Sequence, residues 1–170
     1  MLDKLIFQVA YLFPSKICAK LLGVKMGKNV LVATKTWSTE PWLVTLGDNV
    51  QVTKDVYFHT HGGGHVARPL YPDFDCFGPI VVKDDAYIGS GSHIVPGVTI
   101  GKGCLVAAGS VVTKSTPPHM VVAGNPARCI CSVAEYIEKN LKYNIDTKRM
   151  TLKQKKAFIL ALPKEKLMNK

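Results

Sequence analysis

One stretch of the chain, residues 82–117, repeats every six residues, which is neither the period of a helix nor that of an alternating strand. An aliphatic residue opens each of its six blocks, at Val82, Ile88, Ile94, Ile100, Val106 and Val112. Four positions later, each block has a small or β-branched residue, at Ala86, Ser92, Val98, Cys104, Ser110 and Thr116. This period is typical of a β-helix, in which short strands and turns wind around a prism and each coil stacks on the next. We therefore predict an all-β solenoid in which the aliphatic positions form one continuous core.

Shorter runs of the same pattern precede this stretch, and two interruptions divide them. Blocks begin at Met26 and Val32, and again at Leu46, Val52 and Phe58. Residues 38–45 break the phase, and the pattern disappears a second time between residues 59 and 79. A long loop that leaves a regular scaffold is more often functional than accidental. We therefore predict a protruding functional loop at residues 59–79. Glycines punctuate the blocks, where we expect corners that need a positive φ or a close approach of two backbones.

The two ends of the chain have helical patterns. Apolar residues at helical spacing predict an amphipathic N-terminal segment, and they are Leu5, Ile6, Val9, Leu12 and Phe13. Pro14 is expected to break this segment, Ser15 to cap its second half, and Gly23 to end it. We expect this segment to pack on the prism or on a neighbouring subunit, and attachment to a membrane surface is the alternative.

Capping patterns predict two helices near the C-terminus. Ser132 and Glu135 have capping-box spacing before a helix at residues 133–141, and Thr151 and Gln154 repeat that spacing before a helix that Pro163 ends. The expected organisation is a helical segment at residues 1–23, a β-helix domain at residues 24–131, and a helical extension at residues 132–170.

Charge is distributed unevenly, although the chain as a whole carries a net charge of +10. The ends are basic, with a net charge of +5 in residues 1–35 and +6 in residues 132–170, whereas residues 36–131 have a net charge of −1. Basic ends favour phosphates or an anionic membrane surface, but no recognition motif for nucleic acid accompanies them. Five cysteines without metal-ligand spacing favour a reducing compartment, and the interrupted N-terminus argues against a secretory signal.

The loop contains three of the five histidines of the chain, His59, His61 and His65. An imidazole is the side chain best suited to take a proton from a hydroxyl near neutral pH. A base of this kind needs an acceptor on its other ring nitrogen, and Asp73 or Asp75 is within reach in sequence. We expect His93 and His119 to be surface residues.

Four ordered features together resemble the hexapeptide-repeat acyltransferases. They are the hexapeptides, the loop sequence FHTHGGG, the segment VVTKSTPP and the closing segment AGNPARCI, and they cover residues 24–131. The likeness is to the O-acetyltransferase branch that includes maltose and galactoside acetyltransferases, and to acetyltransferases of surface-polysaccharide biosynthesis. This resemblance implies a left-handed parallel β-helix, a homotrimer, and acetyl-CoA bound between adjacent subunits.

The resemblance also implies roles for individual residues. The family's catalytic histidine follows a threonine at the start of the loop, which corresponds to His61. Residues expected to contact acetyl-CoA are Ser90, Ala108, Thr113, Lys114 and Arg128. His59 and Asp75 are candidate substrate contacts, and no metal ligand is expected.

The expected function is acetyl-CoA-dependent O-acetylation of a sugar hydroxyl in the cytoplasm, with His61 as general base. N-acetylation of an amino sugar is one alternative. A metal enzyme of the same fold, similar to the gamma-class carbonic anhydrases, is another, because His59, His61, His65 and His93 supply enough imidazoles. A non-catalytic binding module of the same fold is the third.

Overall fold

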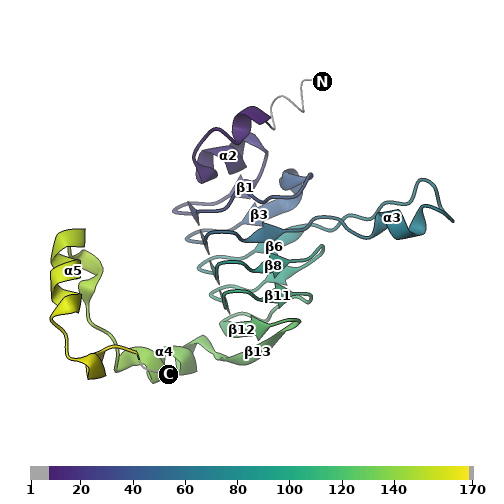
Figure 1. The fold of residues 1–170 in the computed structure, drawn as a ribbon. Coiled ribbons are helices and arrows are strands. Elements are labelled where there is room, and N and C mark those ends of the chain that lie inside the picture. Colours follow the sequence, from purple (N-terminus) through teal and green to yellow (C-terminus); the bar gives the residue numbers. More distant parts are fainter. Residues whose placement is uncertain (1–7, 169–170) are drawn as a thin grey trace. The chain divides into compact units, whose positions relative to one another are not determined.

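The computed structural model describes residues 8–168. The chain forms two compact units, residues 1–133 and 134–170, and the first of them contains the repeats. Figure 1 shows this first unit as a stack of short strands with one loop extending to the side. No helix among the described residues is long and apolar enough to cross a membrane.

The repeats wind into a prism with three faces, in which neighbouring strands are parallel except for β13, which is antiparallel to β12. One face consists of β1 (Lys25–Met26), β3 (Val44–Leu46), β6 (Ile80–Val82) and β9 (Thr99–Ile100). The second consists of β2 (Leu31–Val32), β4 (Gln51–Val52), β7 (Tyr87–Ile88), β10 (Leu105–Val106), β12 (Met120–Gly124) and β13 (Ala127–Ser132). The third consists of β5 (Tyr57–Phe58), β8 (His93–Ile94) and β11 (Val111–Val112). Residues paired between regular coils are 18 positions apart, as in Ile88 with Val106, so one coil takes three blocks.

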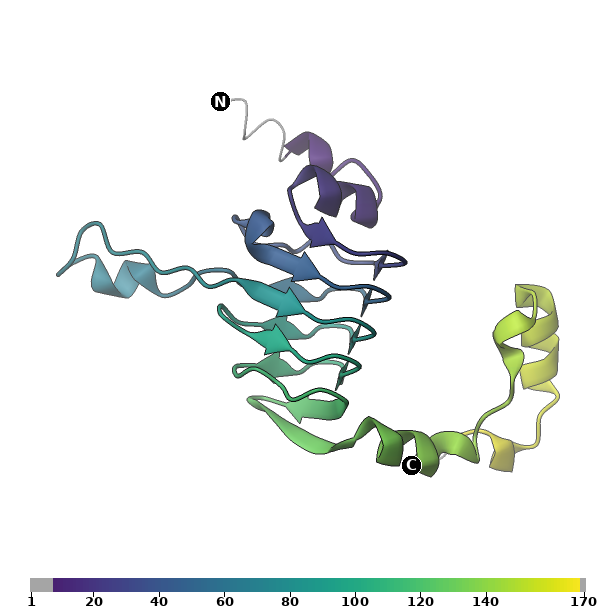
Figure 2. The ribbon, with the colours of Figure 1, turned by 180° about the vertical axis from the view of Figure 1, so that it is seen from behind.

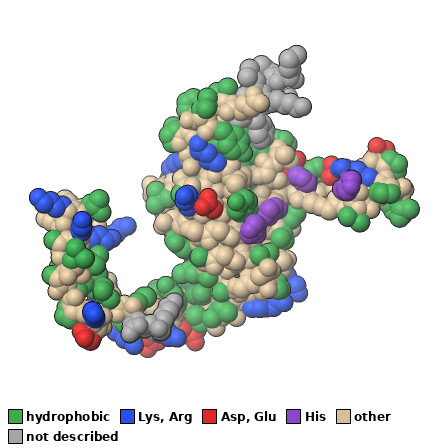
Figure 3. Space-filling model, in the orientation of Figure 1, with side chains coloured by type: hydrophobic (Ala, Val, Ile, Leu, Met, Phe, Trp, Pro, Cys, Tyr) green, Lys and Arg blue, Asp and Glu red, His purple; other side chains and the backbone are tan. Residues whose placement is uncertain are grey.

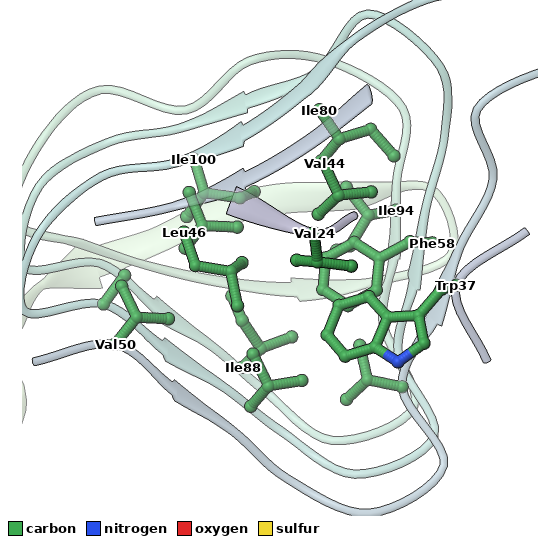
Figure 4. Packing of buried hydrophobic residues seen from close by; sticks show 14 of the residues in the cluster. Val24, Trp37, Val44, Leu46, Val50, Phe58, Ile80, Ile88, Ile94 and Ile100 are labelled. Carbon is green, nitrogen blue, oxygen red and sulfur yellow. The ribbon is translucent and has the colours of Figure 1, made fainter. Parts of the chain in front are cut away.

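The aliphatic residue that opens each block points into the prism, as predicted. Val82, Ile88, Ile94, Ile100, Val106 and Val112 are all buried, and so are the residues four positions later, except Thr116. Figure 4 shows Val44, Leu46, Ile80 and Ile100 filling the inside of the triangle. Trp37 and Phe58 stack in the same core with ring centroids 4.9 Å apart. Burial of these columns is the main stabilising term of the fold.

Two glycines illustrate why glycine occurs at the corners of the prism. Gly91 has a φ of 70°, a conformation that other residues adopt only with strain. Gly89 lies against the next coil, because a Cβ on it would be 2.5 Å from the backbone nitrogen of Ala108. Both expectations for the corners are confirmed.

The two interruptions of the pattern leave the prism intact. In the first, Met26 pairs with Leu46 at a spacing of 20 residues, so this coil is longer than a regular one and contains a 3-10 turn, η1 (Pro41–Leu43). In the second, Leu46 pairs with Val82, and the intervening chain contains the loop that Figure 2 shows projecting from the prism. The loop contains one short helix, α3 (Gly64–Ala67).

The segments at the two ends agree with the predictions in most respects. Helix α2 (Ser15–Leu21) follows Pro14 and buries Cys18 and Ala19, and Gly23 comes directly after its C-cap with a φ of 92°. The prediction for Ser15 was wrong, because the N-cap is Pro14 and no side chain caps this helix. The predicted residues Leu5 and Ile6 lie outside the described part of the chain.

At the last coil of the prism, β12 and β13 form an antiparallel hairpin through Asn125 and Pro126, a strand pair that the sequence pattern did not predict. The helices α4 (Val133–Leu141) and α5 (Leu152–Leu160) begin where the capping patterns placed them, and the box of Thr151 and Gln154 is formed. The 3-10 turns η2 (Thr147–Arg149) and η3 (Lys164–Lys166) complete this part of the chain.

Candidate active site

The root of the loop is held on the prism by backbone contacts. His61 and Phe77 form an antiparallel bridge, and the backbone nitrogen of Gly78 donates to the carbonyl of Thr60 over 2.8 Å. The ring of Phe77 also meets the ring of His61 edge-on, with centroids 5.9 Å apart. His61 therefore has a defined position at the point where the loop leaves the prism, whereas most of residues 62–77 are exposed.

His61 forms a close pair with Glu40. Its Nδ1 atom lies 2.7 Å from Oε2 of Glu40, and the side chains keep 38% and 17% of their accessible surface. An ionised carboxylate can only accept, so the Nδ1–H group of His61 is the donor. When the imidazole is neutral, this arrangement leaves Nε2 of His61 without a proton and able to act as a base.

Two threonines fix the carboxylate of Glu40. The hydroxyl of Thr39 donates to Oε1 over 2.5 Å, and the hydroxyl of the fully buried Thr60 donates to Oε2 over 2.7 Å. Burial pushes the pKa of the Glu40 carboxyl upward, but the hydrogen bonds from Thr39, Thr60 and His61 and the positive charge of His61 outweigh it. The net effect is a pKa below the usual value. Glu40 is therefore ionised at neutral pH.

The acid beside His61 was predicted wrongly from the sequence. Oδ2 of Asp75 lies 3.9 Å from Nη2 of Arg68, and Oδ1 accepts a hydrogen bond from the backbone nitrogen of Cys76. Neither Asp75 nor Asp73 is bonded to His61 in the described structure. Glu40 was missed because it is 21 positions away and has no motif of its own. One feature of the sequence pointed to it: Glu40 lies in the first interruption of the repeat, and His61 lies in the second.

His59 is next to this pair but has different partners. Its Nε2 lies 3.0 Å from Nδ1 of His93, and the two rings are within 5° of parallel with centroids 5.2 Å apart, so they are joined edge to edge. Tyr57 stacks on His93 at 4.7 Å. Burial lowers the pKa of His59, and His93 and His61 lower it further. His93 faces outward as predicted, but it is half-buried between Tyr57 and His59. When both imidazoles are neutral, one of them donates to the other. The two remaining ring nitrogens are then one N–H donor and one acceptor, whichever ring donates.

Figure 3 shows histidine side chains at the surface of the prism beside the root of the loop. His65, in contrast, is exposed in the loop itself. Among the described residues, no group of three or more His, Cys, Asp and Glu side chains is placed to hold a metal ion.

Two of the predicted acetyl-CoA contacts, Ser90 and Ala108, share a corner of the prism. The backbone nitrogen of Gly109 donates to the carbonyl of Ser90, and both side chains are exposed. The hydroxyl of Ser90 donates to Oγ1 of Thr53 on the preceding coil over 3.1 Å. This corner therefore presents small side chains and backbone on successive coils.

Two other predicted acetyl-CoA contacts, Lys114 and Arg128, line a cavity of about 270 Å³. Its lining residues are Val112, Lys114, Ser115, Thr116, Val122, Ala127, Arg128 and Cys129. Thr113 is exposed next to Lys114. Two cations at one open cavity suit an anionic ligand. Among residues 8–168, no hydrogen bond or ion pair joins Lys114 or Arg128 to His61.

The repeats match a family model for the bacterial transferase hexapeptide, with six repeats, over residues 79–114. Protein CapG of Staphylococcus aureus is 40% identical over 152 residues, which cover 87% of this chain and 88% of that protein. The proposed colanic acid biosynthesis acetyltransferase WcaF of Escherichia coli K12 is 36% identical over 128 residues, covering 64% of this chain and 69% of that protein.

Solved structures show the same architecture. The hexapeptide-repeat acetyltransferase VCA0836 of Vibrio cholerae, in complex with acetyl-CoA, has a TM-score of 0.57 and 32% identity, covering 65% of this chain and 60% of that chain. Galactoside acetyltransferase in complex with coenzyme A has a TM-score of 0.59 at 24% identity, covering 80% of this chain and 81% of that chain. The prism is thus a left-handed parallel β-helix.

Proposed function

Because the chain is an acetyltransferase of the bacterial hexapeptide-repeat family, we propose that it moves an acetyl group from acetyl-CoA to a sugar hydroxyl. The observation that carries this proposal is the pair of His61 and Glu40, in which Nδ1 is held by an ionised carboxylate and Nε2 is available. The relative WcaF, which is named for colanic acid biosynthesis, supports a glycan intermediate of a surface polysaccharide as acceptor.

The proposed reaction is a direct transfer without an acyl-enzyme. Nε2 of His61 takes the proton of the acceptor hydroxyl while the hydroxyl oxygen attacks the thioester carbonyl. The tetrahedral intermediate collapses, the carbon–sulfur bond breaks, and the thiolate of CoA takes the proton from the imidazolium. Glu40 stabilises the imidazolium between these two steps, as an ionised acceptor on Nδ1 does in acyl-transfer enzymes. Exposed backbone N–H groups at a corner of the prism would hold the oxyanion.

We place acetyl-CoA along the corner of Ser90 and Ala108, with its phosphates towards Lys114 and Arg128. The small residues of the corner allow close approach of the pantetheine chain, and the two cations offset the negative phosphates. From the resemblance to the hexapeptide-repeat acyltransferases, we further propose that the active site is shared between subunits of a homotrimer. The five free cysteines support a cytoplasmic location.

A screen of acetyl-CoA consumption tests the proposed function. The purified full chain is incubated with acetyl-CoA and with sugars, amino sugars and nucleotide sugars, and released CoA and acetylated product are measured. We expect product with a free hydroxyl acceptor. If acetyl groups are found only on amino groups, the activity is N-acetylation and the proposed O-acetylation is wrong. Hydration of CO₂ that depends on bound zinc, without acetyl transfer, would establish the metal-enzyme alternative instead.

Arg128→Glu is expected to raise the KM for acetyl-CoA by about ten- to a hundredfold, because one charge-assisted contact to phosphate is replaced by repulsion. The KM for the acceptor should change little. The matched control is Lys83→Glu, which makes the same change of charge at an exposed position of the prism. An unchanged KM in the Arg128 variant, or equal effects in both variants, would remove Arg128 from the cofactor site.

A further inference from the structure

The helices α4 and α5 contain no buried residue. Large apolar side chains are exposed throughout this part of the chain, at Tyr136, Ile137, Leu141, Leu152, Phe158, Leu160, Leu167 and Met168. Leu152 and Leu160 keep 84% and 76% of their accessible surface. Exposure of so many large apolar side chains within one short segment indicates a binding surface.

The part of this segment that follows α4 is strongly basic, whereas α4 itself has two glutamates and one lysine. Residues 132–170 have ten basic and four acidic side chains, a net charge of +6. In α5, Leu152, Lys156 and Ile159 follow one another at helical spacing on one face, with Lys153 and Lys155 beside them. Figure 3 shows Lys and Arg side chains interspersed with hydrophobic ones over this unit. The occupant of this surface must therefore accept apolar contact and carry negative charge.

We propose that residues 133–168 bind the surface of an anionic lipid bilayer. Charge favours a bilayer over a second copy of the chain as the partner. The prism, residues 36–131, has a net charge of only −1, whereas anionic lipids provide a dense negative surface. Interleaved lysines and apolar side chains let one segment contact the phosphates and the acyl chains of a bilayer together.

The geometry of the helices suits binding along the surface. Both α4 and α5 have nine residues and are thus roughly 14 Å long, which is too short to cross the hydrocarbon core. Lysine side chains can insert their aliphatic stems while the ammonium groups stay among the phosphates. The proposed surface does not include His61, Glu40 or the cavity at Lys114, so it does not rest on the proposed function.

Co-sedimentation of the full chain with vesicles tests this inference. Vesicles of phosphatidylcholine and phosphatidylglycerol in equal amounts should pellet the protein, whereas vesicles of phosphatidylcholine alone should not, and salt should reverse the binding. The triple variant Lys153→Gln, Lys155→Gln, Lys156→Gln should bind about a hundredfold more weakly, since each lysine near an anionic membrane adds about 1 kcal/mol. Leu152→Ser with Leu160→Ser should also weaken binding.

The matched control is the triple variant Lys25→Gln, Lys28→Gln, Lys54→Gln, which removes the same charge from exposed positions of the prism. It should keep most of the binding. Equal loss in both triple variants, or equal pelleting with uncharged vesicles, would overturn the inference. So would variants of α5 that bind vesicles normally but change the oligomeric state measured by light scattering, because they would make a second copy the occupant.

Discussion

Replacing His61 with alanine is expected to lower kcat for acetyl transfer by about a thousandfold, the usual contribution of a general base. The KM for acetyl-CoA should stay near the wild-type value, because the candidate cofactor residues Lys114 and Arg128 lie at a separate cavity. The structure should also persist, since His61 is at the surface of the prism and the core does not depend on it. The measurement is steady-state kinetics with an acceptor found in the acetyl-CoA screen.

Two comparisons make the result specific for His61. His65→Ala, which removes an exposed imidazole from the same loop, should keep at least half of the activity. Added imidazole should restore part of the activity of His61→Ala, because a free base can enter the space that the side chain leaves. Full activity of the His61 variant, or equal losses at His61 and His65, would contradict the assignment of the base.

The fold was predictable because its signal is local and repeated. Each of the six blocks of residues 82–117 contributes an inward aliphatic residue at the same position, so misreading one block would not change the predicted fold. The capping patterns at Thr151 and at Ser132 are also local, and they placed α4 and α5 correctly. The hairpin of β12 and β13 was missed because Ala127–Ser132 has neither the sixfold period nor a clear alternation.

The site was only half predictable, because it depends on contacts between coils. His61 belongs to a motif within one segment, whereas its partner Glu40 comes from a different coil, and only the winding of the prism brings the two together. The same holds for His59 and His93, which are 34 positions apart and meet because β5 and β8 are neighbours on one face. Asp73 and Asp75 were both within reach by sequence distance, but the loop places Asp75 beside Arg68 instead.

Glu40→Gln is expected to lower kcat on the order of a hundredfold while the prism stays folded. The amide oxygen of glutamine can still accept from Nδ1–H of His61, so the tautomer is kept, but a charge-assisted hydrogen bond becomes a neutral one. Because Glu40 has a lowered pKa and is ionised through the neutral range, its charge favours the imidazolium form of His61 during transfer. Its removal should therefore lower kcat while the KM for acetyl-CoA stays near the wild-type value, a split that a purely structural role would not produce.

Asp73→Asn is the matched control, because it removes the same charge from an exposed acid of the loop. It should leave kcat near the wild-type value, since no hydrogen bond joins Asp73 to His61 in the described structure. A melting curve of each variant separates loss of structure from loss of catalysis. If Glu40→Gln keeps full activity, or if it changes kcat and the KM for acetyl-CoA together, the carboxylate does not act on His61.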